Sequence, residues 1–548
     1  MFPLAPAAGL LLSAFILYGV LPLLPTDKRI HWGVGAPVLV GLCLLSVLFV
    51  PVTYISDDPS QELALLSGWN FSTTESVAAL TARVDLLSLP FLLVLLLALL
   101  AVTLLSSDLY DAPSSDAPPI RLLGWLLMGT AACSLFVSAN GLTILYAVVA
   151  FDVVTAVVWI SKGQHNIGVS RLFLGVFTGV ALVLASLAPG DGSTLGRYAL
   201  GVVLWLRLGL YPLVEFAANR RWRDDERLAY LVLSAGVGLF LVARSLHQPL
   251  PYPLMWLTVI TMLLGGFLTW LVGSAENDAP GVEPTPGQLR ELRTGLVTGL
   301  GLTLALLPLL AAPLDVRAAT AFAVGLLLSL VALWATPALG RPQFSEGAWS
   351  WPYLPAVMST ATLVGVPLSL GWIFRAASYQ SLFRVDSLPI MLVVALAEAL
   401  ALSGLLLYWR WLVRGQEQNL RRSMVGILAM VPFLTPGLGP FILFSIVSPG
   451  RPLFQTDATT FSMIVMVGVV AAAGALGYFK PQLQARLTFW PAIALEPETG
   501  RNALRWADDL FYLLSRLILR VQLVLEGQHY FAWAMVVALV GMIIILLN

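Results

Sequence analysis

The sequence has 548 residues, of which 58% are hydrophobic and only 11% are charged. That composition excludes an ordinary soluble protein, and the formal net charge of zero gives no indication of nucleic-acid binding. Apolar runs of about 20 residues, each long enough to cross a bilayer, recur along the whole chain. The sequence therefore predicts an all-α polytopic membrane protein with about 14–16 transmembrane helices.

Short loops rich in proline, glycine and charge separate the apolar runs, and residues 55–84 form a longer polar segment. The segment 501–523 differs from the spans, because charged residues recur through it while apolar residues fill its other face. It predicts an amphipathic helix along the cytoplasmic surface, or alternatively a helix packed on the protein's own loops. We predict spans at 4–25, 33–54, 85–106, 121–138, 141–161, 168–188, 196–217, 228–246, 251–273, 293–312, 317–339, 353–377, 388–413, 421–447, 459–479 and 529–547.

Basic residues give the expected orientation. They concentrate in the loops after odd-numbered spans, for example Lys162 and the group Arg220, Arg221 and Arg223. The positive-inside rule places these loops in the cytoplasm and the N-terminus outside. The first apolar run lacks a charged leader and a clear cleavage site, so we interpret it as a retained helix.

Ionisable residues inside the spans are the candidate functional residues, because a charge in lipid is costly and usually serves a function. Asp85 and Arg244 lie near span ends, where an interfacial position is one interpretation. The candidates within the spans are Asp152, Arg207, Glu215, Arg375 and Glu398.

Prolines accompany two of these charges. Pro212 follows Arg207 by five residues, and Pro367 precedes Arg375 by eight. Proline interrupts a helix, and broken helices with a charge at the break form the ion sites of many transporters. A simple kink is the alternative for each proline.

Five motifs in order resemble the antiporter-like membrane subunits of respiratory complex I and of Mrp-type cation/proton antiporters. The resemblance covers about residues 80–410. The matching residues are Asp85-Leu86-Leu87-Ser88 at the third helix, Phe151-Asp152 in the fifth, Arg207, Pro212 and Phe216 in the seventh, Gly238 and Arg244 in the eighth, and Gly365, Pro367, Gly371, Trp372 and Arg375 in the twelfth.

The resemblance implies two inverted repeats of five helices, each with one broken helix. Pro212 would mark the break in the first repeat, and Pro367 and Gly371 the break in the second. The expected divisions are N-terminal helices in 1–110, the first repeat in 111–250, the second in 251–415, further helices in 416–480, and the lateral helix with a terminal span in 500–548.

The resemblance also implies that Asp152 pairs with Arg207 beside a polar axis through the membrane centre. This sequence departs from the pattern, because the family's central lysine falls at Gly236 and a nearby histidine at Tyr230. Arginine effectively does not release its proton, unlike a buried lysine. Asp152, Glu215 and Glu398 are therefore the groups left to titrate within the spans.

Structural explanations stay open for each residue. Asp152 and Arg207 can form a static bridge, and Glu215 can meet the arginines at 220–223. Glu398 can act as a neutral hydrogen-bonding acid. Arg375 can pair with Glu398 or extend its charge to the interface.

We predict an antiporter-like subunit of a complex I-like (NADH-quinone oxidoreductase-like) or Mrp-like assembly in a prokaryotic plasma membrane. It would take part in translocating protons or monovalent cations, driven by partner membrane subunits. The alternatives are a fold-retaining subunit without conduction and a membrane subunit of an energy-coupled inorganic-carbon uptake system. No cofactor fingerprint or metal-ligand spacing is present, so the sequence predicts no cofactor, metal or catalytic site of its own.

Overall fold

The computed structural model describes residues 2–23, 32–48, 63–66, 80–105, 120–186, 194–210, 224–274, 286–335, 354–367, 369–384, 387–412, 460–480 and 482–483. Within these residues, 7 helices are long and apolar enough to cross a membrane, and shorter apolar helices accompany them. The chain is thus a helical multi-pass membrane protein, as its composition predicts. The expected span 421–447, lateral helix 501–523 and terminal span 529–547 lie outside the described residues.

The helices before residue 250 follow the predicted spans closely. α5 begins directly after Asn140, whose side chain accepts a hydrogen bond from the Thr143 amide and so caps the helix. The elements are η1 (Phe2–Leu4), α1 (Ala5–Phe15), η2 (Ile16–Val20), η3 (Leu21–Leu23), α2 (Trp32–Leu48), α3 (Ser88–Leu105), α4 (Ile120–Phe136), α5 (Gly141–Ser161), α6 (His165–Ser186), α7 (Thr194–Trp205), the π-helical turn η8 (Leu206–Leu210) and α9 (Asp224–Ser245).

The helices after residue 250 are more often interrupted. They are α10 (Tyr252–Ser274), α11 (Pro286–Ala305), α12 (Leu307–Ala311), α13 (Val316–Thr320), the π-helical segment η9 (Ala321–Leu327), α14 (Leu328–Ala335), α15 (Leu354–Val364), α16 (Leu370–Arg384), α17 (Leu388–Leu412) and α20 (Thr460–Tyr478).

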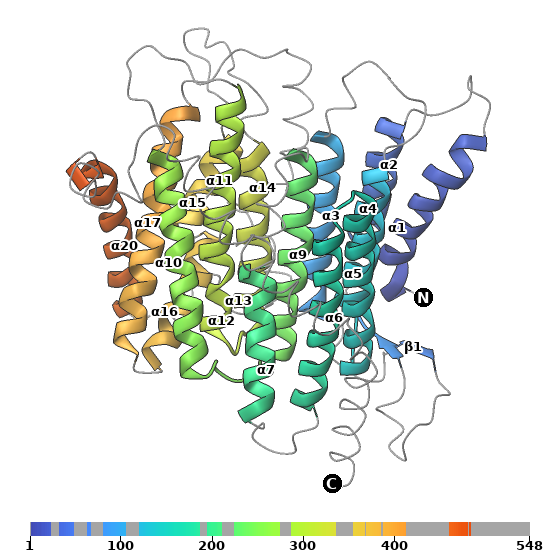
Figure 1. Cartoon of the computed structure of the whole chain (residues 1–548), viewed down its shortest axis with the longest axis horizontal. Helices are drawn as coiled ribbons and strands as arrows, with labels where there is room; N and C mark the ends of the chain where they lie inside the picture. The colour runs from blue at the N-terminus through green and yellow to red at the C-terminus, as the bar shows by residue number, and fades with distance from the viewer. Residues whose placement is uncertain are drawn as a thin grey trace.

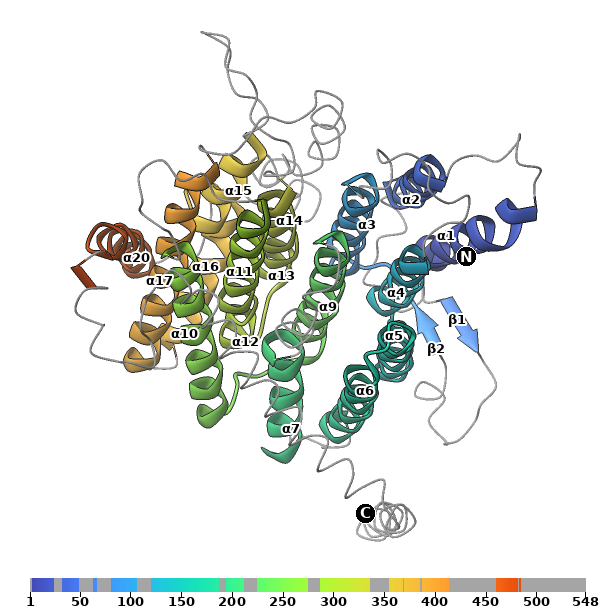
Figure 2. The same ribbon diagram turned by 45° about the horizontal axis from the view of Figure 1, so that its top comes forward.

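The helices stand side by side in two groups (Figures 1 and 2), with α1–α6 in one group, α10–α17 and α20 in the other, and α7 and α9 between them. Neighbouring helices pack in pairs, notably α5 on α6, α10 on α11 and on α17, and α17 on α20. Large apolar side chains are exposed on outer helices, for example Phe177 at 60% and Ile464 at 64%. Such exposure is expected where helices face lipid. The division of the chain into repeats stays a prediction.

A small sheet is the feature of the predicted polar segment that sequence patterns did not indicate. β1 (Leu63–Leu66) and β2 (Leu80–Ala82) pair in antiparallel fashion. The amide of Arg83 donates to the Val137 carbonyl at 2.7 Å, and the amide of Ala139 donates to the Thr81 carbonyl at 3.0 Å. These bonds attach β2 to the turn between α4 and α5.

Close backbone contact holds α10 against α17. An added Cβ at Gly266 would lie 2.2 Å from the Ala397 carbonyl oxygen, and one at Gly404 would lie 2.3 Å from the Thr269 carbonyl oxygen. Small residues permit such approach between membrane helices. The contact fixes the part of α17 that carries Glu398, because Ala397 precedes it.

The second predicted helix break is present. α15 ends at Val364, Gly365 adopts a φ of +76°, and α16 begins at Leu370, with Pro367 within the break. An added Cβ at Gly371 would lie only 1.5 Å from the Thr362 carbonyl oxygen, so the two half-helices touch there. In the first half, α7 passes into the π-helical turn η8, and Pro212 lies beyond the described residues.

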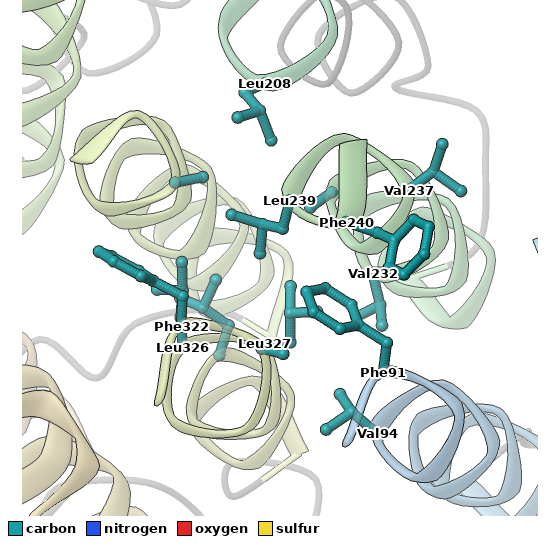
Figure 3. Packing of buried hydrophobic residues seen from close by; sticks show 14 of the residues in the cluster. Phe91, Val94, Leu208, Val232, Val237, Leu239, Phe240, Phe322, Leu326 and Leu327 are labelled. Carbon is teal, nitrogen blue, oxygen red and sulfur yellow. The ribbon is translucent and has the colours of Figure 1, made fainter. Parts of the chain in front are cut away.

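Apolar side chains fill the space between the two groups of helices (Figure 3). Phe240 of α9 packs on Phe91 of α3 with ring centroids 5.3 Å apart, and Phe322 of η9 stacks on Phe374 of α16 at 4.8 Å. We call this packing the apolar barrier. Its buried members are Phe91, Leu208, Leu239, Phe240, Phe322, Leu326, Leu327 and Phe374.

Candidate functional site

A buried carboxylate lies at the centre of the first site. Asp152 of α5 is 0% exposed and is contacted by arginines from two other elements. Arg207 of η8 donates through Nη1 to Oδ1 at 3.2 Å and through Nη2 to Oδ2. Arg171 of α6 places Nε 3.2 Å from Oδ1. Asp152 therefore balances charge from two guanidinium groups at once.

Neighbouring polar groups orient both arginines. Arg207 Nε donates to Thr178 Oγ1 at 3.0 Å, and Arg171 Nη2 donates to Ser234 Oγ of α9 at 3.0 Å. An added Cβ at Gly175 would lie 3.0 Å from an Asp152 oxygen, so this glycine leaves room for the carboxylate. The site thus joins α5, α6, η8 and α9. π-Helical turns such as η8 are often found at functional sites.

The second site lies beside the broken helix. Arg375 of α16 and Glu398 of α17 are each 0% exposed, and Arg375 Nε lies 3.5 Å from Glu398 Oε2. Arg375 Nη1 also donates to the carbonyl of Val364, the last residue of α15, at 2.5 Å. A cation at this position is favourable, because the C-terminal end of a helix carries partial negative charge. Arg375 therefore links the half-helix α15 to Glu398.

The second site has polar atoms with unmet hydrogen-bonding capacity. Among the described residues, Arg375 Nε and Nη2 and both Glu398 oxygens have no hydrogen-bond partner. The hydroxyl of Tyr379, which is 0% exposed, makes no hydrogen bond of ordinary geometry but lies close enough to Glu398 to interact with it. The Arg375–Glu398 site therefore retains hydrogen-bonding capacity, whereas both oxygens of Asp152 are engaged.

Asp85 and Arg244, which lie near span ends, form a third charge cluster. Asp85, just before α3, is 2% exposed. It accepts hydrogen bonds from Arg244 Nη1 at 2.5 Å and from the amide and hydroxyl of Ser88 at 2.8 and 2.6 Å. Burial alone would raise the pKa of Asp85, but Arg244 and Ser88 outweigh it and lower the pKa. The cluster joins the start of α3 to the end of α9.

The structure describes most of the predicted site residues. It brings Asp152 to Arg207 and Arg375 to Glu398, and it places Gly371 at the contact of the half-helices. Pro212 and Glu215 lie outside the described residues. Their functional roles, like those of the other predicted site residues, stay predictions.

Sequence reasoning missed two residues. Arg171 lies only three residues inside the predicted span 168–188, so its charge resembled an ordinary interfacial one. Tyr379 gave no signal, since a tyrosine in an apolar helix is common. A helical projection would have placed Tyr379 on the same face as Arg375, four residues earlier.

The positions where the resemblance implies central basic residues lie against apolar or aromatic side chains. An added Cβ at Gly236 would meet Leu327 at 3.7 Å and Phe136 at 3.8 Å. Tyr230 packs on Trp159, with ring centroids 5.5 Å apart. Within the described residues, no group of three or more His, Cys, Asp or Glu could hold a metal ion.

No family model and no curated protein matches this chain by sequence. Solved structures do match it. A chain of the membrane-bound sulfane sulfur reductase, an archaeal respiratory membrane complex, superposes with a TM-score of 0.59 and 15% identity over 100% of this chain and 99% of its own length. A chain of the Mrp complex from Dietzia sp. DQ12-45-1b superposes with a TM-score of 0.61 and 14% identity.

The Mrp match covers 98% of this chain, which spans only 63% of the matched chain. At these identities, the likeness shows the fold. This chain has the antiporter-like fold of polytopic membrane subunits, as the five motifs predicted.

Proposed function

We propose that this chain is an antiporter-like subunit that moves protons or monovalent cations within a multi-subunit complex of a prokaryotic plasma membrane. Partner membrane subunits supply the driving force. The proposal follows from the fold shared with chains of a respiratory complex and of the Mrp complex. The N-terminus is expected outside, from the distribution of basic residues.

The observation that carries the proposal is a pair of buried arginine–carboxylate sites, one on each side of the apolar barrier. Asp152 and Glu398 are each 0% exposed, and each contacts an arginine on an irregular or broken helix. A static bridge would not require such irregular helices on both sides. Transporters commonly place ion sites at such breaks, near the membrane centre.

The chemistry assigns different tasks to the two residue types. The arginines stay charged, so they act as fixed positive charges. Glu398 can gain and lose a proton, and the strength of its ion pair with Arg375 decides which state is favoured. A partner that moves α16 relative to α17 would change the Arg375–Glu398 distance. That change would favour release or uptake of a proton at Glu398.

A subunit that keeps the fold without conduction is the second candidate. The apolar barrier favours it, because Leu208 follows Arg207 and Phe374 precedes Arg375, with packed side chains between them. No basic residue stands at Gly236 or Tyr230 to link the two sites.

The experiment uses the complex purified through a tag on this chain and reconstituted into liposomes. An imposed potassium diffusion potential drives proton flux, which a trapped pH-sensitive dye reports. We expect Asp152→Asn and Glu398→Gln to reduce the flux strongly. Wild-type liposomes without flux above empty liposomes, or two variants with unchanged flux, would support the non-conducting candidate instead. Ser403→Ala, on α17 five residues after Glu398, serves as the control.

A further inference from the structure

Three fully buried polar side chains meet between α16 and α17. They are Arg375, Tyr379 and Glu398, each 0% exposed. Tyr379 follows Arg375 by four residues, so both lie on one face of α16. Glu398 interacts with Arg375 at 3.5 Å and with the Tyr379 hydroxyl. We call this arrangement the Tyr379 pocket.

The Tyr379 pocket has unmet donors and acceptors in close proximity. Arg375 Nη2 has no hydrogen-bond partner among the described residues. Arg375 Nε, the Tyr379 hydroxyl and the Glu398 oxygens make no hydrogen bond of ordinary geometry, although Nε lies 3.5 Å from Oε2 and the hydroxyl interacts with the carboxylate. Buried polar groups nearly always hydrogen-bond to protein or to ordered water. The pocket is thus built for a small ligand that can accept from tyrosine and arginine and donate to a carboxylate.

We propose that the Tyr379 pocket binds water, and that Tyr379 positions this water against Glu398 for proton transfer. The inference rests on the proposed function, since the water serves to exchange protons with Glu398. It adds Tyr379 as a positioning residue and gives protons, not metal cations, as the species handled in this half of the chain.

The charges of the pocket select a neutral ligand. The Arg375 guanidinium lies 3.5 Å from a Glu398 oxygen and would repel a sodium or potassium ion there. The Glu398 carboxylate would likewise repel an anion. A water molecule makes two to four hydrogen bonds of both kinds, which suits the donors and acceptors present.

The transfer step balances without another reactant. The bound water gives one proton to the Glu398 carboxylate while it accepts one from a hydronium ion outside the pocket, which leaves two water molecules and a neutral carboxylic acid. Release is the reverse reaction. The Tyr379 hydroxyl keeps its own proton and donates a hydrogen bond to the water, and Arg375 stays charged throughout.

The test compares three variants of the reconstituted complex. Tyr379→Phe removes the hydroxyl and keeps the ring, Glu398→Gln removes the carboxylate, and Tyr408→Phe is the matched control. Tyr408 is buried on α17 and lies ten residues from Glu398, about 15 Å along the helix axis. We expect Tyr379→Phe to lower proton flux about tenfold, the equivalent of one lost hydrogen bond, and Tyr408→Phe to leave it unchanged.

Infrared spectroscopy separates positioning from a structural role. A carboxylic acid band that appears on acidification of the wild type and is missing in Glu398→Gln belongs to protonated Glu398. In the wild type, we expect this band to shift promptly on transfer to D₂O, because water reaches the pocket. In Tyr379→Phe we expect it at a higher frequency, because a hydrogen-bonded neighbour is lost.

The outcomes distinguish the two proposals. If Glu398→Gln leaves flux unchanged, the proposed role of this half and the present inference both fail. If Glu398→Gln stops the flux while Tyr379→Phe changes neither flux nor the Glu398 band, only the inference fails. A wild-type Glu398 band that does not respond to D₂O also overturns it, and that measurement requires no Tyr379 variant to fold.

Discussion

Among the residues that the structure describes, Asp152 contacts two arginines, whereas Glu398 contacts one. We therefore predict that neutralising Asp152 lowers the stability of the fold more than neutralising Glu398 does. Asp152→Asn preserves the shape of the side chain but leaves Arg171 and Arg207 without their shared countercharge. At 3.2 Å, each contact is worth about 5 kcal/mol for unit charges at an effective dielectric constant of about 20. Removing one partner from a buried pair typically costs about 3–5 kcal/mol. Asp152→Asn should reach or exceed the upper end of this range.

Glu398→Gln should cost less, because Glu398 meets one arginine, at 3.5 Å. A double variant, Asp152→Asn with Arg171→Gln, should recover part of the lost stability by removing one of the two uncompensated charges. The expected order of stability is therefore wild type, Glu398→Gln, the double variant and Asp152→Asn.

The chain offers its own probe for this measurement. Cys43 and Cys133 are its only cysteines, and both are buried. Their labelling by a thiol reagent during heating, quantified by mass spectrometry of the two peptides, reports unfolding of this chain within the complex. The reasoning is refuted if Asp152→Asn is no less stable than Glu398→Gln, or if the two substitutions of the double variant simply add.

Two further predictions use the same labelling assay. Gly371→Ala should destabilise the chain, because its Cβ would lie 1.5 Å from the Thr362 carbonyl oxygen. Gly474→Ala is the control, because its Cβ would meet nothing within 4 Å. Equal destabilisation by the two substitutions would contradict this prediction. Asp85 should stabilise the fold above its ordinary pKa of 3.8, and this contribution should be lost as pH falls through the lowered pKa. Asp85→Asn should therefore reduce stability at neutral pH and flatten its acid dependence; an unchanged acid profile would refute the role of the Arg244 contact.

The helices were predictable because lipid imposes a simple rule on sequence. A spanning helix needs a long apolar run, and α5 has the predicted bounds of 141–161 because Asn140 caps a continuous apolar segment. The break near Pro367 was also predictable from the sequence, because proline and glycine interrupt a helix. Charges inside apolar runs likewise identified Asp152 and Glu398.

The contacts between side chains on different helices were harder to predict than the positions of the buried charges. Sequence spacing relates residues on one helix, whereas Arg171 and Asp85 meet their partners across helices that only the packing brings together. A charge near the end of a span also gives no indication of whether its side chain is buried in the protein, as Asp85 is. Tyr379 carried no signal, because its importance comes from hydrogen-bonding capacity left unmet in the packed structure.

The apolar barrier has an electrical consequence. Closely packed apolar side chains resist the passage of ions, yet they also screen an electric field far less than water does. A proton gained at Glu398 would therefore change the electrostatic potential at Arg207 more than it would through the same thickness of water. The barrier would therefore allow electrostatic coupling between the Arg207 and Glu398 sites without allowing ions to pass from one to the other.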